Sequence, residues 1–271
     1  MHYTKEQLEV EIAKRAPWYQ SIDFPEYGIS TTDKPENMLD DDAWDNKIGD
    51  LSIQEATRLR PKPKWNAIRD KLPNVTGMDV LEIGCNCGFF SFGFARDGAK
   101  SVTGLDVASK WLSNANWCKE VLGYSNIRFY NCDFMLFDGS DSAGHGGLLS
   151  NKNQSVPLPD NLFDLIFSST VLDHLFFPLF AIYKMIRMSR RWVVIDVPLI
   201  EPRFKDESLL KFSYSEDLNH HGFNGSKSLF LGYFQRLGVP ESDIRCHEYN
   251  DYMNITYVID TSNFSSGLVG V

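Results

Sequence analysis

The sequence predicts an α/β protein with a Rossmann-like, doubly wound sheet that is mostly parallel and has an antiparallel C-terminal strand. Short apolar runs alternate with amphipathic helical patterns from Met78 onward, a glycine-containing turn follows the first run, and the last two runs fit an antiparallel pair. Such alternation favours parallel strands joined by right-handed crossovers. In an open sheet of this kind, ligands bind in the crevice at the carboxyl ends of the strands.

Each element is assigned from its local pattern. The predicted strands are Asp79–Ile83, Ser101–Leu105, Ile127–Asn131, Leu162–Phe167, Trp192–Val197, Ile244–Glu248 and Asn254–Ile259. The predicted helices of this part are Phe89–Arg96, Ser109–Leu122, Phe176–Met188 and Ser226–Leu237. Two insertions are expected within this domain of residues 76–271: a long surface loop at about 138–161 and an irregular stretch at about 199–225.

Residues 1–75 are predicted to form an N-terminal helical or irregular cap. Thr4 and Gln7 have capping-box spacing and predict a helix that ends near Pro17. The stretch that follows contains many turn formers and carboxylates, so we expect a solvated connector whose aromatic residues nevertheless pack on the main domain. Two further helices are predicted, at about Ser52–Arg60 and Lys64–Leu72.

Composition restricts the class of protein. The 271 residues are 43% hydrophobic and 23% charged, which is typical of a globular chain. No apolar run is long enough to span a membrane, and the charged start lacks the apolar region of a secretory signal, so a soluble cytoplasmic protein is expected. The formal charge of −9 repels phosphate and weighs against nucleic acid as a partner.

The five cysteines predict reduced thiols rather than a disulfide framework. Their number is odd, and a chain of this length can stabilise itself by its core. Cys85 and Cys87 have the spacing of half a metal site, but no second close pair of cysteines or histidines completes one. No metal is therefore predicted.

The turn after the first strand is the most informative segment. Gly84 and Gly88 allow the backbone to turn sharply and to approach a ligand closely. A nicotinamide fingerprint would require glycine at the positions of Asn86 and Phe89, which disfavours an NAD-dependent dehydrogenase.

With Glu82, this turn reads acidic-x-Gly-x-x-x-Gly and resembles motif I of class I S-adenosylmethionine (SAM) methyltransferases. The resemblance implies that the loop backs onto the amino-acid end of the cofactor. The residues implied there are Glu82, Gly84, Cys85, Asn86 and Gly88.

The ends of the next strands support the same cofactor. Asp106 ends the second strand, 22 positions after Gly84, where a carboxylate can accept hydrogen bonds from both ribose hydroxyls. Asp133 ends the third strand, where the family places an acid near the adenine amine and an apolar neighbour against the ring. Val107, Phe134 and Ser169 are predicted to complete the cofactor site.

The resemblance narrows to one branch. Several segments are similar to the wobble-uridine carboxymethyltransferase-like enzymes: Lys64-Trp65, Leu72–Gly77, Gly88–Phe92 and Val171–His174 with Pro178. The typical member has Tyr-His followed by basic residues, whereas this chain has Asp173-His174-Leu175-Phe176. The departure disfavours carboxy-S-adenosylmethionine as cofactor and tRNA as partner.

The predicted chemistry is in-line displacement at the sulfonium methyl, for which the protein aligns the acceptor and excludes water. Asp173 and His174 follow the fourth strand, and histidine, whose ordinary pKa lies near neutrality, is the better candidate base. The alternatives are that His174 only shapes its loop, and that Asp173 binds a cation of the cofactor or substrate.

Four residues are predicted to contact the acceptor: Lys64, Trp65, His220 and His221. An ordinary amphipathic helix explains Trp65 equally well, and the histidine pair also fits an exposed turn.

The predicted function is therefore SAM-dependent methyl transfer to a small-molecule or nucleotide-like acceptor. Two alternatives remain: a tRNA wobble-uridine (carboxy)methyltransferase-like enzyme, and a catalytically silent SAM-binding protein. The oligomeric state is not predicted.

Overall fold

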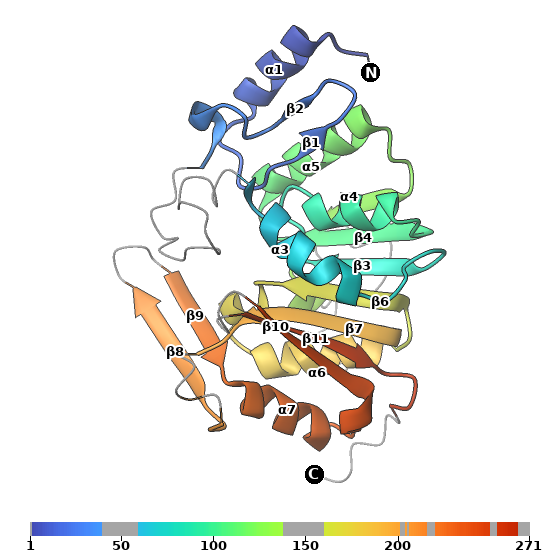
Figure 1. The fold of residues 1–271 in the computed structure, drawn as a ribbon, viewed down its shortest axis with the longest axis vertical. Helices are drawn as coiled ribbons and strands as arrows, with labels where there is room; N and C mark the ends of the chain where they lie inside the picture. Colours follow the sequence, from blue (N-terminus) through green and yellow to red (C-terminus); the bar gives the residue numbers. More distant parts are fainter. Residues whose placement is uncertain are drawn as a thin grey trace, which may run out of the picture.

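A computed structural model describes residues 2–39, 59–137, 160–200, 204, 206–215, 220–249 and 254–264. Its centre is a seven-stranded sheet in the order β10-β11-β7-β6-β3-β4-β5 (Figure 1). The five parallel strands are β3 (Asp79–Ile83), β4 (Ser101–Asp106), β5 (Ile127–Asn131), β6 (Phe163–Ser169) and β7 (Ser189–Pro198). The antiparallel strands are β10 (Ile244–Tyr249) and β11 (Asn254–Asp260). The predicted fold class is confirmed.

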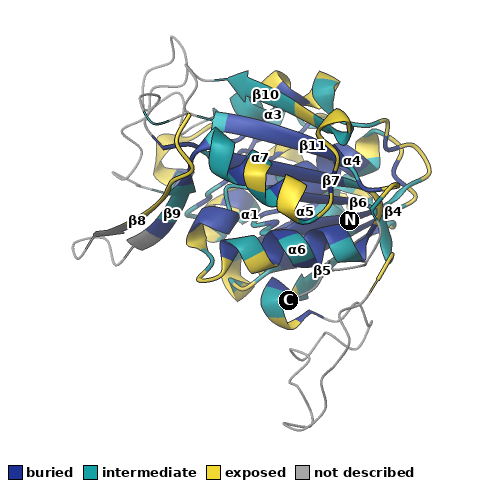
Figure 2. Ribbon diagram, turned by 90° about the horizontal axis from the view of Figure 1, so that it is seen from below, coloured by how far each residue is buried: buried dark blue, intermediate teal, exposed yellow. Residues whose placement is uncertain are grey.

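Helices cover both faces of the sheet. One face packs against α3 (Lys62–Ile68), α4 (Phe89–Arg96) and α5 (Ser109–Leu122), and the other against α6 (Pro178–Met188) and α7 (Lys227–Arg236). Because successive side chains of a strand point to opposite faces, Val80 enters the first of these two cores and Leu81 the second. Figure 2 shows the buried central strands between more exposed helices.

The helix bounds follow local signals. The structure has α4 and α5 as predicted, and α5 is followed by the capping residue Gly123, whose φ of +75° is readily adopted by glycine. The Ser226 hydroxyl caps α7 by accepting a hydrogen bond from the Leu229 amide at 3.2 Å. The start of α6 is Pro178 rather than the predicted Phe176, because proline is favoured in the first turn of a helix.

The N-terminal segment mixes helices with a small sheet. Helix α1 (Lys5–Lys14) has the predicted capping box, and a two-stranded sheet follows, formed by β1 (Asp23–Phe24) and β2 (Ile29–Ser30). Short 3₁₀ helices η1 (Pro35–Asn37) and η2 (Arg69–Lys71) complete the described part.

The described part of the predicted connector is not a solvated linker. Trp18 and Phe24 are buried and pack against Trp117 of α5. The expectation that its aromatic residues pack on the main domain is therefore confirmed for these two, while the expectation of a solvated chain is wrong here. The predicted helix Ser52–Arg60 lies outside the described residues, apart from its last two positions.

The C-terminal insertion contains a β-hairpin where an irregular stretch was predicted. Strand β8 (Leu210–Ser215) pairs with β9 (His220–Gly225), and the rings of Phe212 and Phe223 pack with their centroids 4.9 Å apart. The prediction was wrong because β9 contains two glycines and an asparagine and so lacks the residue pattern of a strand. It is a strand through its pairing with β8. The predicted loop at 138–161 lies outside the described residues, apart from 160 and 161.

Three further 3₁₀ helices shape the turns: η3 (Phe134–Leu136), η5 (Leu172–His174) and η7 (Glu241–Asp243). In the part of the chain that the structure describes, every helix is too short or too polar to cross a bilayer.

Candidate functional site

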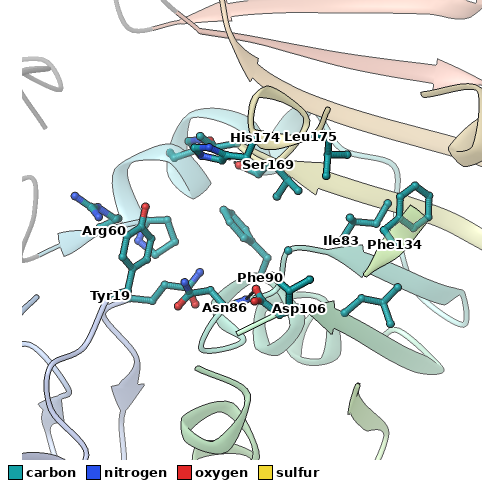
Figure 3. A pocket seen from close by; sticks show the side chains of 18 of the residues that line it. Tyr19, Arg60, Ile83, Asn86, Phe90, Asp106, Phe134, Ser169, His174 and Leu175 are labelled. Atoms are coloured by element: carbon teal, nitrogen blue, oxygen red, sulfur yellow. Dashed lines mark hydrogen bonds between the residues drawn. The ribbon is translucent and has the colours of Figure 1, made fainter. Parts of the chain in front are cut away.

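A cavity of about 420 Å³ lies at the carboxyl ends of the parallel strands. In Figure 3, Tyr19 and Arg60 form one wall, Asn86 and Asp106 lie together on the floor, and Ser169 and His174 lie on the opposite side. Residues from the N-terminal segment and from four strand ends line it: Tyr19, Gln20, Arg60, Pro61, Pro63, Lys64, Ile83, Gly84, Asn86, Phe90, Leu105, Asp106, Val107, Cys132, Asp133, Phe134, Ser169, Thr170, Val171, His174 and Leu175.

The Asp106 carboxylate is oriented by backbone amides. Its Oδ2 accepts a hydrogen bond from the Asn86 N–H and its Oδ1 one from the Ala108 N–H, each at 2.8 Å. Burial raises the pKa of Asp106, and the hydrogen bonds from backbone amides oppose that rise. A carboxylate has about four lone-pair sites, so both oxygens can still accept from a vicinal diol such as a ribose.

The glycine turn forms the floor of the cavity. Gly84 has φ +73°, and a Cβ there would lie 2.2 Å from Cγ2 of Val171, so only glycine allows the two walls to approach so closely. Asn86 also has a left-handed conformation, with φ +49°. Space without side chains beside an oriented carboxylate fits a nucleoside with an attached amino-acid tail.

Two residues of this loop that were predicted to contact the cofactor, Cys85 and Gly88, do not line the cavity, and neither does Cys87 between them. Cys85 and Cys87 are fully buried, and burial raises the pKa of the Cys87 thiol to about 12. Gly88 has φ +90°, and a Cβ there would lie 2.7 Å from the Phe129 ring. The structure gives these residues a role in shaping the turn.

The far end of the cavity is formed by the η3 turn. Asp133 Oδ1 accepts the Met135 N–H at 2.8 Å, and the Phe134 side chain borders the cavity. The ammonium of the buried Lys184 donates to the carbonyl oxygens of Phe134 at 2.6 Å and Met135 at 3.1 Å. Val107, an apolar side chain that is 71% exposed, also borders the cavity, and its contact with the cofactor stays a prediction.

Glu82 lies beneath the cavity and does not line it. The side chain is buried in β3, and its Oε2 accepts a hydrogen bond from the Ser91 hydroxyl of α4. Burial raises the pKa of Glu82 to about 8. The structure therefore assigns Glu82 to joining the strand and the helix on either side of the glycine turn.

This carboxyl group predicts a pH dependence of stability. The folded protein binds its proton more tightly than the unfolded chain, so stability is lost as pH rises from about 4.5 to about 8, by up to about 1.4 kcal/mol per pH unit. Glu82→Gln mimics the protonated form, so its unfolding free energy is expected to fall less between pH 6 and pH 8. Urea denaturation of both proteins at several pH values measures this; parallel pH profiles would contradict it.

His174 and Asp173 lie at the rim, in η5. His174 lines the cavity, and its Nε2 is 3.5 Å from Oδ2 of Asp173, which is 8% exposed and is not itself a lining residue. The histidine can reach a substrate in the cavity, while the aspartate can only orient it.

Lys64 and Trp65, predicted as one contact pair, diverge. Lys64 lines the cavity, and its ammonium lies 2.8 Å from the carboxylate of Asp196, which is fully buried. Trp65 is buried instead against Phe90 and Phe94 of α4, with ring centroids 5.7 and 5.5 Å away. Lys64 therefore reaches the site, whereas Trp65 stabilises the core.

His220 and His221 lie in β9 as far as the backbone is concerned, and their side chains lie outside the described residues. Their predicted contact with the acceptor stays a prediction.

Sequence reasoning missed a wall made by the N-terminal segment. Tyr19 stacks on Arg60, whose guanidinium carbon is 4.4 Å from the ring centroid. Gln20 Oε1 accepts the Phe89 N–H at the start of α4, at 3.1 Å. The sequence predicted only that the aromatic residues of this segment pack on the main domain, and nothing in their spacing placed them at the strand ends.

Asp196 was also missed. It is the only charged residue in the apolar run Trp192–Val197, which is a position where a buried carboxylate requires partners.

Comparison with known proteins agrees with this geometry. The methyltransferase domain family matches residues 74–211, just over half of the chain, and the chain belongs to that family. The predicted class, a SAM-dependent methyltransferase of class I fold, is confirmed.

The individual proteins that resemble this chain match it over a short segment or at low sequence identity. A tRNA U34 carboxymethyltransferase of Nautilia profundicola is 33% identical over 97 residues, which cover 32% of this chain and 31% of that protein, so the match spans less than a third of either. The N-terminal domain of EvdMO1 with S-adenosylhomocysteine (SAH) bound is 15% identical, with a TM-score of 0.62 over 95% of this chain and 96% of that one. Magnesium protoporphyrin IX methyltransferase of Synechocystis with bound SAM is 16% identical, with a TM-score of 0.51 over 79% and 86%.

The oriented carboxylate makes a direct prediction about affinity. Asp106→Ala is expected to weaken binding of SAH by about 1–3 kcal/mol, because charge-assisted hydrogen bonds to the ribose are lost. Titration calorimetry measures the dissociation constant. Asp260→Asn serves as control, since Asp260 pairs with Trp192 at the opposite end of β7. Equal affinities of the Asp106 variant and wild type would contradict the site.

Proposed function

We propose that the protein transfers the methyl group of SAM to a small-molecule or nucleotide-like acceptor, with His174 as the base. The observation that carries the proposal is one cavity bordered by the oriented Asp106, the glycine turn and His174. The cofactor supplies an electrophilic methyl group on a positively charged sulfur. The residues of the chain have to bind, align and deprotonate the acceptor.

The arrangement of side chains suits this division of work. Asp106 and Asp133 border the end of the cavity formed by β4 and β5, and His174 borders the β6 side. An acceptor held near His174 can lose its proton to the imidazole, while Asp173 keeps the ring in place. The side chains of Tyr19, Phe90 and Leu175 line the cavity, where they exclude water and favour alignment of the acceptor with the methyl group.

The size of the cavity and the charge of the protein favour a small acceptor. The cavity lies within the usual range for small-molecule sites, and its walls are largely apolar with a few convergent polar groups. The formal charge of −9 opposes a polyanion at long range.

A second candidate is modification of the wobble uridine of tRNA. Its support is the 97-residue similarity to the tRNA U34 carboxymethyltransferase. The cofactor would then be SAM or carboxy-S-adenosylmethionine, and binding of tRNA would weaken steeply with salt.

Label transfer distinguishes the candidates. The protein is incubated with methyl-labelled SAM and either a small-metabolite extract or bulk tRNA. Label in the small-metabolite fraction supports the proposal, and label in tRNA supports the second candidate. Tight SAH binding without label in either fraction would indicate a catalytically silent SAM-binding protein.

A further inference from the structure

Thr170 has an unusual backbone conformation at the edge of the cavity. It follows β6 directly, lines the cavity, and has φ +53°. A positive φ is a genuine outlier for a β-branched residue, and such outliers cluster at functional sites. The conformation is held by a hydrogen bond from the Thr170 N–H to the Asp196 carbonyl oxygen at 2.8 Å.

Neighbouring groups determine what the Thr170 hydroxyl can do. The Lys64 ammonium donates to Thr170 Oγ1 and, at 3.2 Å, to Ser169 Oγ. Ser169 in turn donates its proton to Asp196 Oδ2 at 2.8 Å. Among the described residues, none accepts the proton of Thr170, so this hydroxyl has a proton to donate.

The Lys64 ammonium is itself held in place. It pairs with Asp196, which also accepts hydrogen bonds from the hydroxyls of Tyr249 at 2.6 Å and Thr256 at 3.0 Å. A buried carboxylate with this many donors fixes the lysine behind Thr170 Oγ1. The positive charge there polarises the hydroxyl and makes its proton a better donor.

The order of strands shows which part of a bound cofactor lies near. Asp133 follows β5, Asp106 ends β4, Gly84 follows β3 and Thr170 follows β6, and these four strands are successive neighbours about 4.8 Å apart. A nucleoside over the ends of β5 and β4 therefore has its amino-acid tail over β3 and β6. Of the two charged groups on that tail, the ammonium only donates, and the carboxylate accepts.

We propose that the Thr170 hydroxyl, oriented and polarised by Lys64, binds the carboxylate of the cofactor's methionine portion. The inference rests on the proposed function and adds a residue that fixes the tail of the cofactor. Ser169, predicted earlier as a cofactor contact, acts through Lys64 and Asp196 because its own proton is already used.

Thr170→Val tests this, because valine keeps the size and branching of threonine and removes only the hydroxyl. Dissociation constants are measured by calorimetry for SAH and for its decarboxylated analogue, S-adenosyl-3-thiopropylamine, which lacks only the carboxylate. The variant is expected to bind SAH about tenfold more weakly and the analogue as wild type does. Thr170→Ser is expected to restore the affinity for SAH.

Equal effects on both ligands, or none on SAH, would overturn the proposal. Thr261→Val, at the opposite end of the sheet, is the matched control and should change neither constant. If the valine variant does not fold, Thr170→Gly replaces it, since glycine adopts the positive φ without strain. Wild-type protein that binds neither ligand would instead refute the proposed function.

Discussion

Replacing His174 by alanine is expected to lower kcat at least about 100-fold, because a positioned base typically contributes 10²- to 10⁴-fold to proton transfer. KM for SAM should change little, since His174 lies on the β6 side of the cavity and Asp106 and Asp133 border the other end. The measurement is steady-state production of SAH with the acceptor found by label transfer.

Two variants sharpen this test. Asp173→Asn keeps the side-chain shape and is expected to have a smaller effect, because Asp173 acts on the imidazole rather than on the substrate. His247→Gln, in β10 and outside the cavity lining, should leave kcat unchanged. A kcat of His174→Ala within threefold of wild type would leave the histidine only a loop-shaping role.

Asp196→Ala is expected to lower the free energy of unfolding by about 3–5 kcal/mol, the usual cost of removing one partner of a buried ion pair. The carboxylate is fully buried, and its loss leaves the Lys64 ammonium and the hydroxyl groups of Ser169, Tyr249 and Thr256 without their acceptor. Urea denaturation with an unchanged m-value measures the loss.

A double-mutant cycle separates this pairing from a loss of packing. Lys64→Met removes the charge that Asp196→Ala leaves behind, so the double variant should be more stable than Asp196→Ala alone. Additive losses would show that Lys64 and Asp196 do not interact energetically.

The parallel strands and the helices between them could be predicted from the sequence because the local residue patterns agree with the overall fold. Phe89–Arg96 and Ser109–Leu122 have helical apolar spacing, and each follows a short strand. The hairpin formed by β8 and β9 could not be predicted in the same way. Leu210–Ser215 alternates apolar and polar residues, but His220–Gly225 contains two glycines and is a strand only through its partner.

The cofactor side of the site was predictable for a related reason. Successive parallel strands end at one edge, so Asp106 and Asp133 had to lie near each other once the strands were assigned. Arg60 and Tyr19 could not be placed, because their position depends on tertiary packing of a segment with no regular period. Thr170 was missed because its significance lies in its backbone conformation, which threonine rarely adopts.

The hydrogen bond between Gln20 and the first turn of α4 joins two parts of the chain with different duties. The ends of the parallel strands line one side of the cavity, and residues upstream of the sheet, Tyr19 and Arg60 among them, line another side. Substitutions in that upstream stretch can therefore reshape one wall of the cavity while Asp106 and Asp133 at the strand ends stay in place.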